Sequence, residues 1–296
     1  MKNCFFGSGV ALVTPFNADF SVDYPSLEKL VEYQIANGTD FLVVQGTTGE
    51  SPTLSLEEKA NVLETVLQVN AGRLKVVYGL GGNDTLNVCE QLKSIPHPVD
   101  GILSVSPYYN KPTQRGIIEH YKRLAEATDL PLILYNVPGR TGSNVLAETT
   151  LKLAEIPNIV AVKEASGSME QIMEIIRLKP EGFGVLSGDD AITMPLIAAG
   201  ADGVISVVAN AFPRLFSEMV QASMNENLGV ARTRHYELLS ITKMFFEEGN
   251  PGGVKTALEV LNIMKPTMRL PLFPISDALS DRIRTETERL THLVEA

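Results

Sequence analysis

The sequence predicts an α/β fold, a (β/α)8 barrel followed by a helical extension. Eight short runs of apolar, often β-branched residues alternate with eight helical patterns, which is typical of repeated strand–helix units. Within each run the residues are continuously apolar, as in parallel strands covered on both faces. The chain has 296 residues, of which 44% are hydrophobic, enough for one large barrel with a substantial core. Eight such units close naturally into a barrel.

Local signals mark each strand–helix unit. Asp23 and Pro25 open the first helix, Asn37-Gly38 closes it, and Ser55-Leu56-Glu57-Glu58 is a capping box that starts the second. The predicted strands cover residues 7–16, 41–44, 75–81, 101–106, 131–136, 159–162, 183–187 and 203–208. The later helices are predicted to begin near Asp84, Pro112, Asn144, Ser168 and Asp190.

A doubly wound open sheet is the alternative fold. It would place a GxGxxG loop after the first strand, and the sequence has none there. Gly79-Leu80-Gly81-Gly82 is similar, but it follows the third strand and lacks the third glycine. We therefore favour the closed barrel.

Beyond about Phe212 the chain is helical to its end. Three further helices, at roughly 229–247, 252–264 and 276–295, exceed what the eighth unit needs. We expect two parts. Residues 1–225 form the barrel with the active site, and residues 226–296 form a helical appendage that packs on the barrel or serves an oligomer contact.

Composition excludes several classes of partner. The formal net charge is −10 and no basic run is present, which argues against nucleic acid or an anionic membrane surface. The N-terminus has no signal-peptide pattern, and no apolar segment approaches membrane-spanning length. Two cysteines without a CxxC pair indicate reduced thiols in a cytoplasmic protein. The four histidines are scattered, so we expect no protein-ligated metal.

Lys163 follows the buried run Ile159-Val160-Ala161-Val162. An ammonium at the end of an apolar strand must reach solvent, pair with an acid, or lose its proton to desolvation. A lysine whose charged form is disfavoured can capture a carbonyl compound as a Schiff base. The alternative is a structural lysine that pairs with a neighbour such as Glu164.

The carboxyl ends of barrel strands meet at one face, where the catalytic groups of such barrels lie. That rule selects Thr47, Thr48, Tyr108, Tyr109, Tyr135, Arg140, Lys163, Gly188, Asp189, Asp190, Ile205 and Ser206. A lysine iminium of a 2-oxo acid loses a proton to give an enamine, which attacks an aldehyde. Phenols can move the protons, hydroxyls and backbone N–H groups can hold one carboxylate, and an arginine can bind a second.

Most of these residues also have a purely structural interpretation. Tyr135 could be a core aromatic, Thr47-Thr48 a turn, and Arg140 a surface residue. Tyr108-Tyr109 could serve packing or an interface, and Asp189-Asp190 could start a helix rather than act as an acid–base pair.

Five motifs together reduce that ambiguity. They are Gly46-Thr47-Thr48-Gly49-Glu50, Tyr108-Tyr109-Asn110, Tyr135-Asn136-Val137-Pro138-Gly139-Arg140-Thr141, Lys163-Glu164-Ala165 and Ser187-Gly188-Asp189-Asp190. In this order and spacing the chain resembles the dihydrodipicolinate synthase and N-acetylneuraminate lyase superfamily of pyruvate-dependent class I aldolases, from about residue 5 to its end. The Thr-Thr pair and the Gly-Arg-Thr turn favour the synthase branch over sialic acid lyases.

The resemblance implies a lyase that condenses pyruvate with L-aspartate 4-semialdehyde in the diaminopimelate route to lysine. It implies that Lys163 forms the Schiff base and that no separate cofactor is needed. Tyr135, Thr47 and Tyr109 match the proton relay, with Tyr109 supplied by a neighbouring subunit. Thr48 matches the pyruvate carboxylate contact and Arg140 the semialdehyde carboxylate contact, and Gly188 and Ile205 are expected to line the substrate site. Family members commonly form homotetramers, built as dimers of dimers.

One departure from the family concerns inhibition by lysine. Ser51, Asn83 and Tyr108 fit the effector site of lysine-sensitive enzymes. Leu56 and Lys59 replace histidines, and Asn87 replaces a glutamate that would bind the effector's amino group. We therefore predict weak or absent inhibition by lysine, because a positive Lys59 and the loss of an acid disfavour a cationic effector.

Two other functions remain open from the sequence. One is a different pyruvate aldolase, acting on a sugar-like or 2-oxo-3-deoxy acid. The other is a barrel that binds a 2-oxo acid or a protein partner without turnover; the intact lysine–phenol–hydroxyl set disfavours it.

Overall fold

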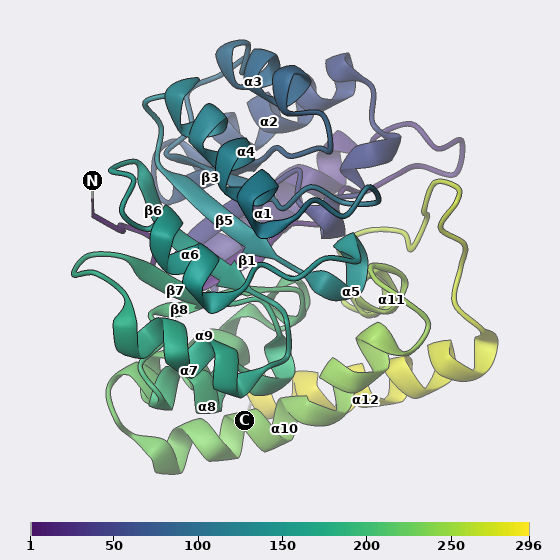
Figure 1. Ribbon diagram of the computed structural model, residues 1–296. Coiled ribbons are helices and arrows are strands. Elements are labelled where there is room, and N and C mark those ends of the chain that lie inside the picture. The colour runs from purple at the N-terminus through teal and green to yellow at the C-terminus, as the bar shows by residue number, and fades with distance from the viewer. Residues whose placement is uncertain (1, 296) are drawn as a thin grey trace.

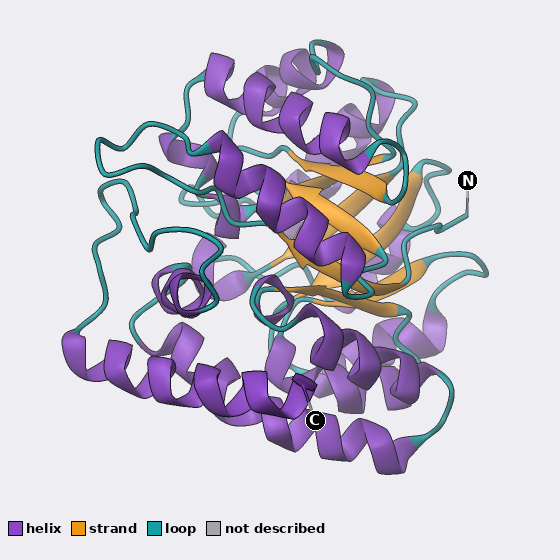
Figure 2. Cartoon of the chain, turned by 180° about the vertical axis from the view of Figure 1, so that it is seen from behind, coloured by secondary structure: helices purple, strands orange, loops and turns teal. Residues whose placement is uncertain are grey.

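Eight parallel strands close into a barrel in the order of the chain, and helices surround it (Figure 1 and Figure 2). This computed structural model describes residues 2–295, so Met1 and Ala296, the outer ends of the two predicted parts, lie outside the described residues. The strands are β1 (Gly7–Ala11), β2 (Phe41–Val44), β3 (Lys75–Gly79), β4 (Gly101–Val105), β5 (Leu132–Asn136), β6 (Ile159–Glu164), β7 (Gly184–Ser187) and β8 (Gly203–Ser206). The predicted (β/α)8 barrel is confirmed, and the open sheet is excluded.

Four of the barrel helices begin at the capping residues that the sequence marks, whereas the helices expected near Asn144 and Asp190 begin three residues later, at Ala147 and Thr193. Ser55 and Glu58 form both hydrogen bonds of the capping box, and Asp23, Asp84 and Ser168 each cap a helix with their side chains. The helices are α1 (Tyr24–Ala36), α2 (Leu56–Asn70), α3 (Thr85–Lys93), α4 (Gln114–Glu126), α5 (Pro138–Thr141), α6 (Ala147–Leu153), α7 (Met169–Leu178), α8 (Thr193–Ala198) and α9 (Pro213–Met224). Short 3-10 turns are η1 (Thr47–Gly49), η2 (Ser51–Thr53), η3 (Asp190–Ile192) and η4 (Val208–Asn210).

Several strands are shorter than their apolar runs. The first was expected to reach residue 16, but β1 ends at Ala11, which pairs with Val43 one residue before β2 ends. An apolar run shows burial, whereas a strand also needs a neighbouring backbone for its hydrogen bonds. Leu12 and Val13 are therefore buried in a loop beyond the ladder.

Two apolar layers cover the two faces of the barrel wall. The inner layer is a compact cluster that includes Phe41, Val43, Ala161, Leu186 and Ile205. The outer layer lies between the sheet and the helices. Successive strand residues point to opposite faces, so each buried strand supplies both layers, and no polar alternation is visible in the sequence.

The C-terminal segment forms α10 (Leu228–Glu247), α11 (Gly252–Val260) and α12 (Asp277–Glu295), close to the predicted ranges. α10 and α12 run alongside each other at the bottom of Figure 1, where Arg282 pairs with Glu247 at 2.9 Å. α11 packs against α10 and α12. It ends before the predicted residue 264, because Asn262 takes a left-handed φ of 55°.

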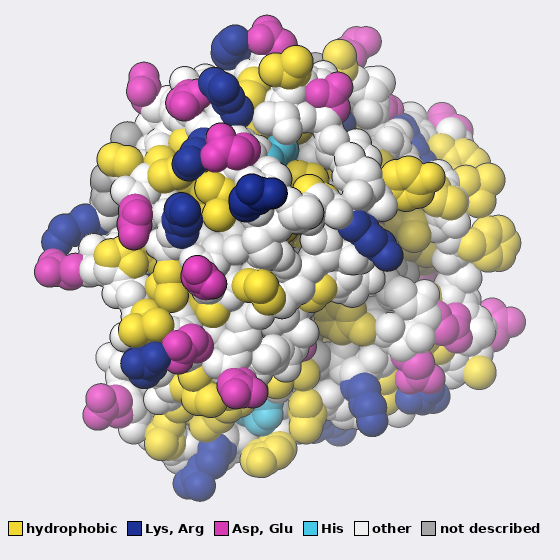
Figure 3. All heavy atoms as spheres, in the orientation of Figure 1, with side chains coloured by type: hydrophobic (Ala, Val, Ile, Leu, Met, Phe, Trp, Pro, Cys, Tyr) yellow, Lys and Arg dark blue, Asp and Glu magenta, His cyan; other side chains and the backbone are white. Residues whose placement is uncertain are grey.

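Charged side chains of both signs are interspersed over the face seen in Figure 3. Among the described residues, no helix has both the length and the apolar composition that a membrane crossing requires.

Candidate active site

Lys163 lies inside strand β6, one residue before its end, and only 5% of it is exposed. The predicted strand, which ends at Val162, is therefore two residues too short. Lys163 is in register with Tyr135 on β5 and with Leu186 on β7. Its side chain follows Ala161 on the inner face, so the amine is held at the mouth of the barrel.

The Tyr135 ring lies beside the lysine amine. Lys163 Nζ lies 4.5 Å from the centre of that ring, within the range of a cation–π contact. Tyr135 is 7% exposed and belongs to the inner apolar cluster. The structure thus brings together two of the predicted catalytic residues, an amine and a phenol.

Glu164 does not pair with Lys163, so the structural interpretation of this lysine is wrong in that respect. The Glu164 carboxylate accepts hydrogen bonds from the Asn136 amide and from the Ser166 hydroxyl. Adjacent residues of a strand point to opposite faces, which sends Glu164 away from the barrel interior. Burial raises the pKa of Glu164, and its hydrogen bonds oppose that rise.

Gly188 follows β7 and borders the lysine stem. A β-carbon built there would lie 3.1 Å from Lys163 Cε and 2.8 Å from Ala165 Cβ, so a side chain would displace the lysine. Ile205 on β8 is 1% exposed and packs in the same inner cluster as Tyr135. Both predicted lining residues therefore lie close to the lysine–phenol pair.

Asp189 and Asp190 have different environments. Asp189 caps η3 through the Ala191 N–H, as the structural interpretation expected. Asp190 is 4% exposed, and its Oδ2 accepts hydrogen bonds from the backbone N–H groups of Val207 and Val208 at 2.9 and 3.0 Å. Burial raises the pKa of Asp190, opposed by these bonds and by the attraction of Lys163. The sequence selected Asp190 for the barrel mouth but could not show that, unlike Asp189, it is buried close to the lysine.

Thr47 and Thr48 lie in the turn η1, directly after β2. Thr47 is exposed, whereas Thr48 is 2% exposed and its Oγ1 accepts a hydrogen bond from Asn250 Nδ2 at 3.0 Å. Asn250 lies between the predicted helices of residues 229–247 and 252–264, and no role for it was apparent from the sequence. Its role escaped sequence reasoning because 202 positions separate the two residues.

Tyr109 and Arg140 are exposed in the single chain. Tyr109 is 86% exposed and takes a left-handed φ of 73°. Its N–H donates to the carbonyl of Thr141 at 3.3 Å, which ties its loop to the short helix α5 that carries Arg140. The structure places these two loops together but does not bring either side chain to Lys163.

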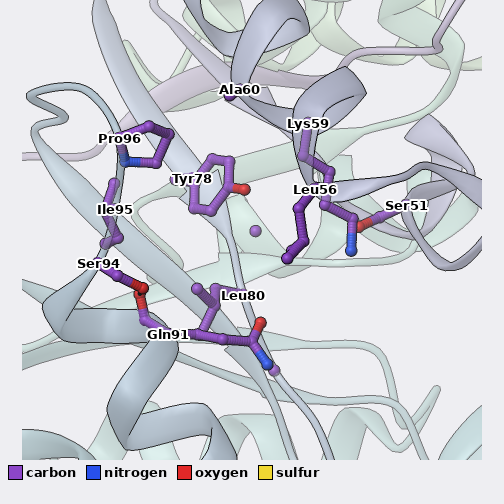
Figure 4. Close-up of a pocket in the computed structure, with 12 residues that line it drawn as sticks. Ser51, Leu56, Lys59, Ala60, Tyr78, Leu80, Gln91, Ser94, Ile95 and Pro96 are labelled. Atoms are coloured by element: carbon purple, nitrogen blue, oxygen red, sulfur yellow. The ribbon is translucent and has the colours of Figure 1, made fainter.

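A separate cavity of about 210 Å³ lies between α2, β3 and α3, with Ser51, Leu56 and Lys59 on one wall. Figure 4 shows the Tyr78 ring between that wall and the opposite one, formed by Ser94, Ile95 and Pro96. Burial lowers the pKa of Lys59. Three residues of the predicted effector region thus line the cavity, and Asn83 and Tyr108 are joined nearby by a 3.3 Å hydrogen bond.

The barrel mouth therefore combines a buried amine, a phenol, a buried carboxylate and hydroxyl groups. An amine of this kind can add to a ketone, and a neighbouring phenol can move the protons of that addition. Within residues 2–295 no group of three or more His, Cys, Asp or Glu side chains could hold a metal ion.

Comparisons with known proteins agree with this arrangement. A model of the dihydrodipicolinate synthetase family matches residues 4–289. A relative from Parabacteroides distasonis, named 4-hydroxy-tetrahydrodipicolinate synthase, is 51% identical over 96% of this chain and 97% of its own length. The crystal structure of dihydrodipicolinate synthase from Aquifex aeolicus superposes with a TM-score of 0.92 at 44% identity, covering 97% of this chain and 98% of that chain. The chloride-inhibited synthase from Acinetobacter baumannii, solved with pyruvate, gives 0.93 at 42% identity, with 96% and 98% covered.

Proposed function

The chain belongs to the dihydrodipicolinate synthetase family, and from this we propose that Lys163 carries the reaction by forming a Schiff base with pyruvate. The activity is that of a 4-hydroxy-tetrahydrodipicolinate synthase, a lyase of the diaminopimelate route to lysine, as in relatives at about 50% identity. The same relatives speak against the alternative of an aldolase for sugar-like acids. The buried Lys163 beside Tyr135 is the observation that carries the proposed mechanism.

The proposed chemistry begins with attack of the Lys163 amine on the ketone carbon of pyruvate. Loss of water from the carbinolamine gives an iminium, and loss of a methyl proton gives an enamine. The enamine carbon attacks the aldehyde of L-aspartate 4-semialdehyde, and the aldehyde oxygen takes up a proton. The amine of the semialdehyde then displaces Lys163 and closes the ring. The lysine iminium itself withdraws electrons from the reacting carbon, so the proposal needs no separate cofactor.

The proposed roles of the other residues follow from their places. Tyr135, Thr47 and Tyr109 move the protons, and the 86% exposure of Tyr109 in one chain suits a residue that reaches a neighbouring subunit. Thr48 holds the pyruvate carboxylate. Arg140, exposed on α5, receives the carboxylate of the semialdehyde.

Gly188 and Ile205 shape the pocket around the lysine. We propose a homotetramer in which Tyr109 crosses a tight dimer interface, with the helices of residues 226–296 packed as an appendage on the barrel of residues 1–225. We propose the cytoplasm as the compartment, where the two free cysteines, Cys4 and Cys89, stay reduced.

Reductive trapping tests the mechanism. Borohydride added with pyruvate should give a covalent adduct on the peptide that contains Lys163, and Lys163→Ala should give neither adduct nor turnover. Adduct formation on another lysine would contradict the assignment.

A panel of aspartate semialdehyde, N-acetylmannosamine and glyceraldehyde tests specificity. We expect aspartate semialdehyde to have the highest kcat/KM and Arg140→Ala to remove that preference; an unchanged preference in Arg140→Ala would contradict the role of the arginine.

A further inference from the structure

The loop that carries the threonines is held from a distant part of the chain. Asn250 Nδ2 donates to Thr48 Oγ1 at 3.0 Å, and both side chains are buried. Two residues further along the loop, Glu50 pairs with Lys255 at 2.5 Å, and both of these side chains have 0% exposure. Asn250 and Lys255 both lie in the segment after residue 226, at the start of α11.

Two residues at the ends of this loop have an unfavourable backbone conformation. Gln45 and Glu50, which flank it, take left-handed φ angles of 65° and 53°. Residues other than glycine adopt such angles at a cost in free energy, which neighbouring contacts must offset. Glu50 receives a further hydrogen bond from the Arg269 N–H at 3.2 Å, again from the C-terminal segment.

Lys255 is itself firmly placed. Its Nζ donates to the carbonyl of Thr267 at 2.8 Å and lies 4.5 Å from the centre of the Phe16 ring. Burial lowers the pKa of Lys255 to about 8, and the attraction of Glu50 opposes that shift. The far end of the loop is thus tied to residues of α11 and of the segment that follows it.

The direction of the Asn250–Thr48 hydrogen bond has a chemical consequence. A threonine hydroxyl has one proton to donate and two lone pairs that accept. When Asn250 donates to Oγ1, it occupies an acceptor position and leaves the Thr48 proton free for another partner. A substrate carboxylate accepts hydrogen bonds and cannot donate them, so it is the complementary partner for that proton.

We propose that Asn250 is a positioning residue that orients the Thr48 hydroxyl as a donor to the carboxylate of the 2-oxo acid. This inference rests on the role proposed above for Thr48. The helical segment after residue 226 would then help to form the carboxylate site, through its contacts with Thr48 and Glu50. This role is separate from any contact that the segment makes with other subunits.

Steady-state kinetics of four variants and one control variant test this proposal. Thr48→Val and Asn250→Ala should each raise the KM for pyruvate by roughly 10- to 100-fold, the effect of one lost hydrogen bond to a charged group. The kcat and the KM for the semialdehyde should stay within about twofold. The double variant should be no worse than Thr48→Val alone, because both changes remove the same interaction.

Asn250→Asp separates orientation from packing. The variant keeps the shape of the side chain, but its carboxylate can only accept hydrogen bonds. The Thr48 hydroxyl should then donate its proton to this carboxylate instead of to the substrate, so the KM for pyruvate should rise more than in Asn250→Ala. Thr256→Val is the matched control, because Thr256 is a buried residue of α11 that bonds only to the Gly252 carbonyl at 3.0 Å. Thermal unfolding of each variant confirms that it is folded.

The outcomes distinguish the role proposed for Asn250 from the role proposed for Thr48. If Thr48→Val raises the KM for pyruvate but Asn250→Ala does not, or if their effects add in the double variant, the role of Asn250 is overturned and that of Thr48 stands. A wild-type KM in Asn250→Asp also overturns the role of Asn250. If Thr48→Val leaves the KM unchanged, the carboxylate assignment of Thr48 fails, and the inference fails with it.

Discussion

Lys163 and Tyr135 are cross-strand partners on β6 and β5, and the lysine amine lies 4.5 Å from the centre of the tyrosine ring. Both side chains are buried at the carboxyl end of a closed parallel barrel. The two residues are 28 positions apart in sequence, and the register of the sheet alone makes them neighbours. The proposed mechanism depends on this pair, because the lysine supplies the nucleophile and the tyrosine moves protons.

Tyr135→Phe separates the ring from its hydroxyl. The variant keeps the aromatic contact with Lys163 but loses the proton donor, so we expect kcat to fall by about 10²-fold or more. Borohydride trapping with pyruvate should still label Lys163. Tyr33→Phe is the control, because the Tyr33 hydroxyl donates to the Ala211 carbonyl at 2.9 Å, outside the site. A kcat for Tyr135→Phe equal to that of Tyr33→Phe would exclude the phenol from the proton path.

Gly188→Ala tests the space around the lysine. The new β-carbon would lie 3.1 Å from Lys163 Cε and 2.8 Å from Ala165 Cβ, and the lysine stem must move to relieve this contact. We expect kcat/KM for pyruvate to fall by about 10- to 100-fold, as when a reacting group is misplaced by about 1 Å. Gly229→Ala on α10 is the control, since the nearest atom to its β-carbon lies 3.7 Å away. Full activity in Gly188→Ala would show that the lysine tolerates displacement.

L-Lysine should inhibit weakly or not at all. Lys59 stands beside the cavity of about 210 Å³ with Leu56 and Ser51, and its positive charge repels a cationic effector. Inhibition is measured from initial rates at fixed pyruvate and rising L-lysine. The triple variant Leu56→His, Lys59→His, Asn87→Glu should become more sensitive than the parent chain. A submillimolar inhibition constant for the parent would refute this prediction.

His120 should make the stability depend on pH. Burial lowers its pKa from 6.5 to about 4, so between these values the unfolded chain binds a proton that the folded chain does not. Stability is therefore greatest above pH 6.5 and decreases as the pH falls toward 4, by about 3 kcal/mol in total for this group.

His120→Gln should remove this part of the pH dependence while Gln accepts or donates toward Thr85, whose Oγ1 lies 2.9 Å from His120 Nδ1. The measurement is the free energy of unfolding in urea from about pH 7 to about pH 4.5, at one protein concentration. Equal slopes for the parent and His120→Gln would show that another group titrates there.

The sequence by itself determined that the chain folds as a barrel, the order of its strand–helix units and its family. Those features rest on local signals. Ser55 and Glu58 cap the helix that follows them, and Ile159 to Val162 form a strand because continuous apolar residues must be buried on both faces. The stretch around Lys163 alone left both a nucleophilic and a structural lysine open, and the resemblance carried by the five motifs implied the Schiff-base role.

Only the tertiary structure decided what each side chain meets. Closure of the barrel turned Lys163 inward and Glu164 outward, which the apolar run could not show because both faces of the strand are buried. Folding also brought Asn250 to Thr48 and Lys255 to Glu50 across more than 200 positions. Contacts at such separations depend on the packing of whole helices, and no local pattern of residues records them.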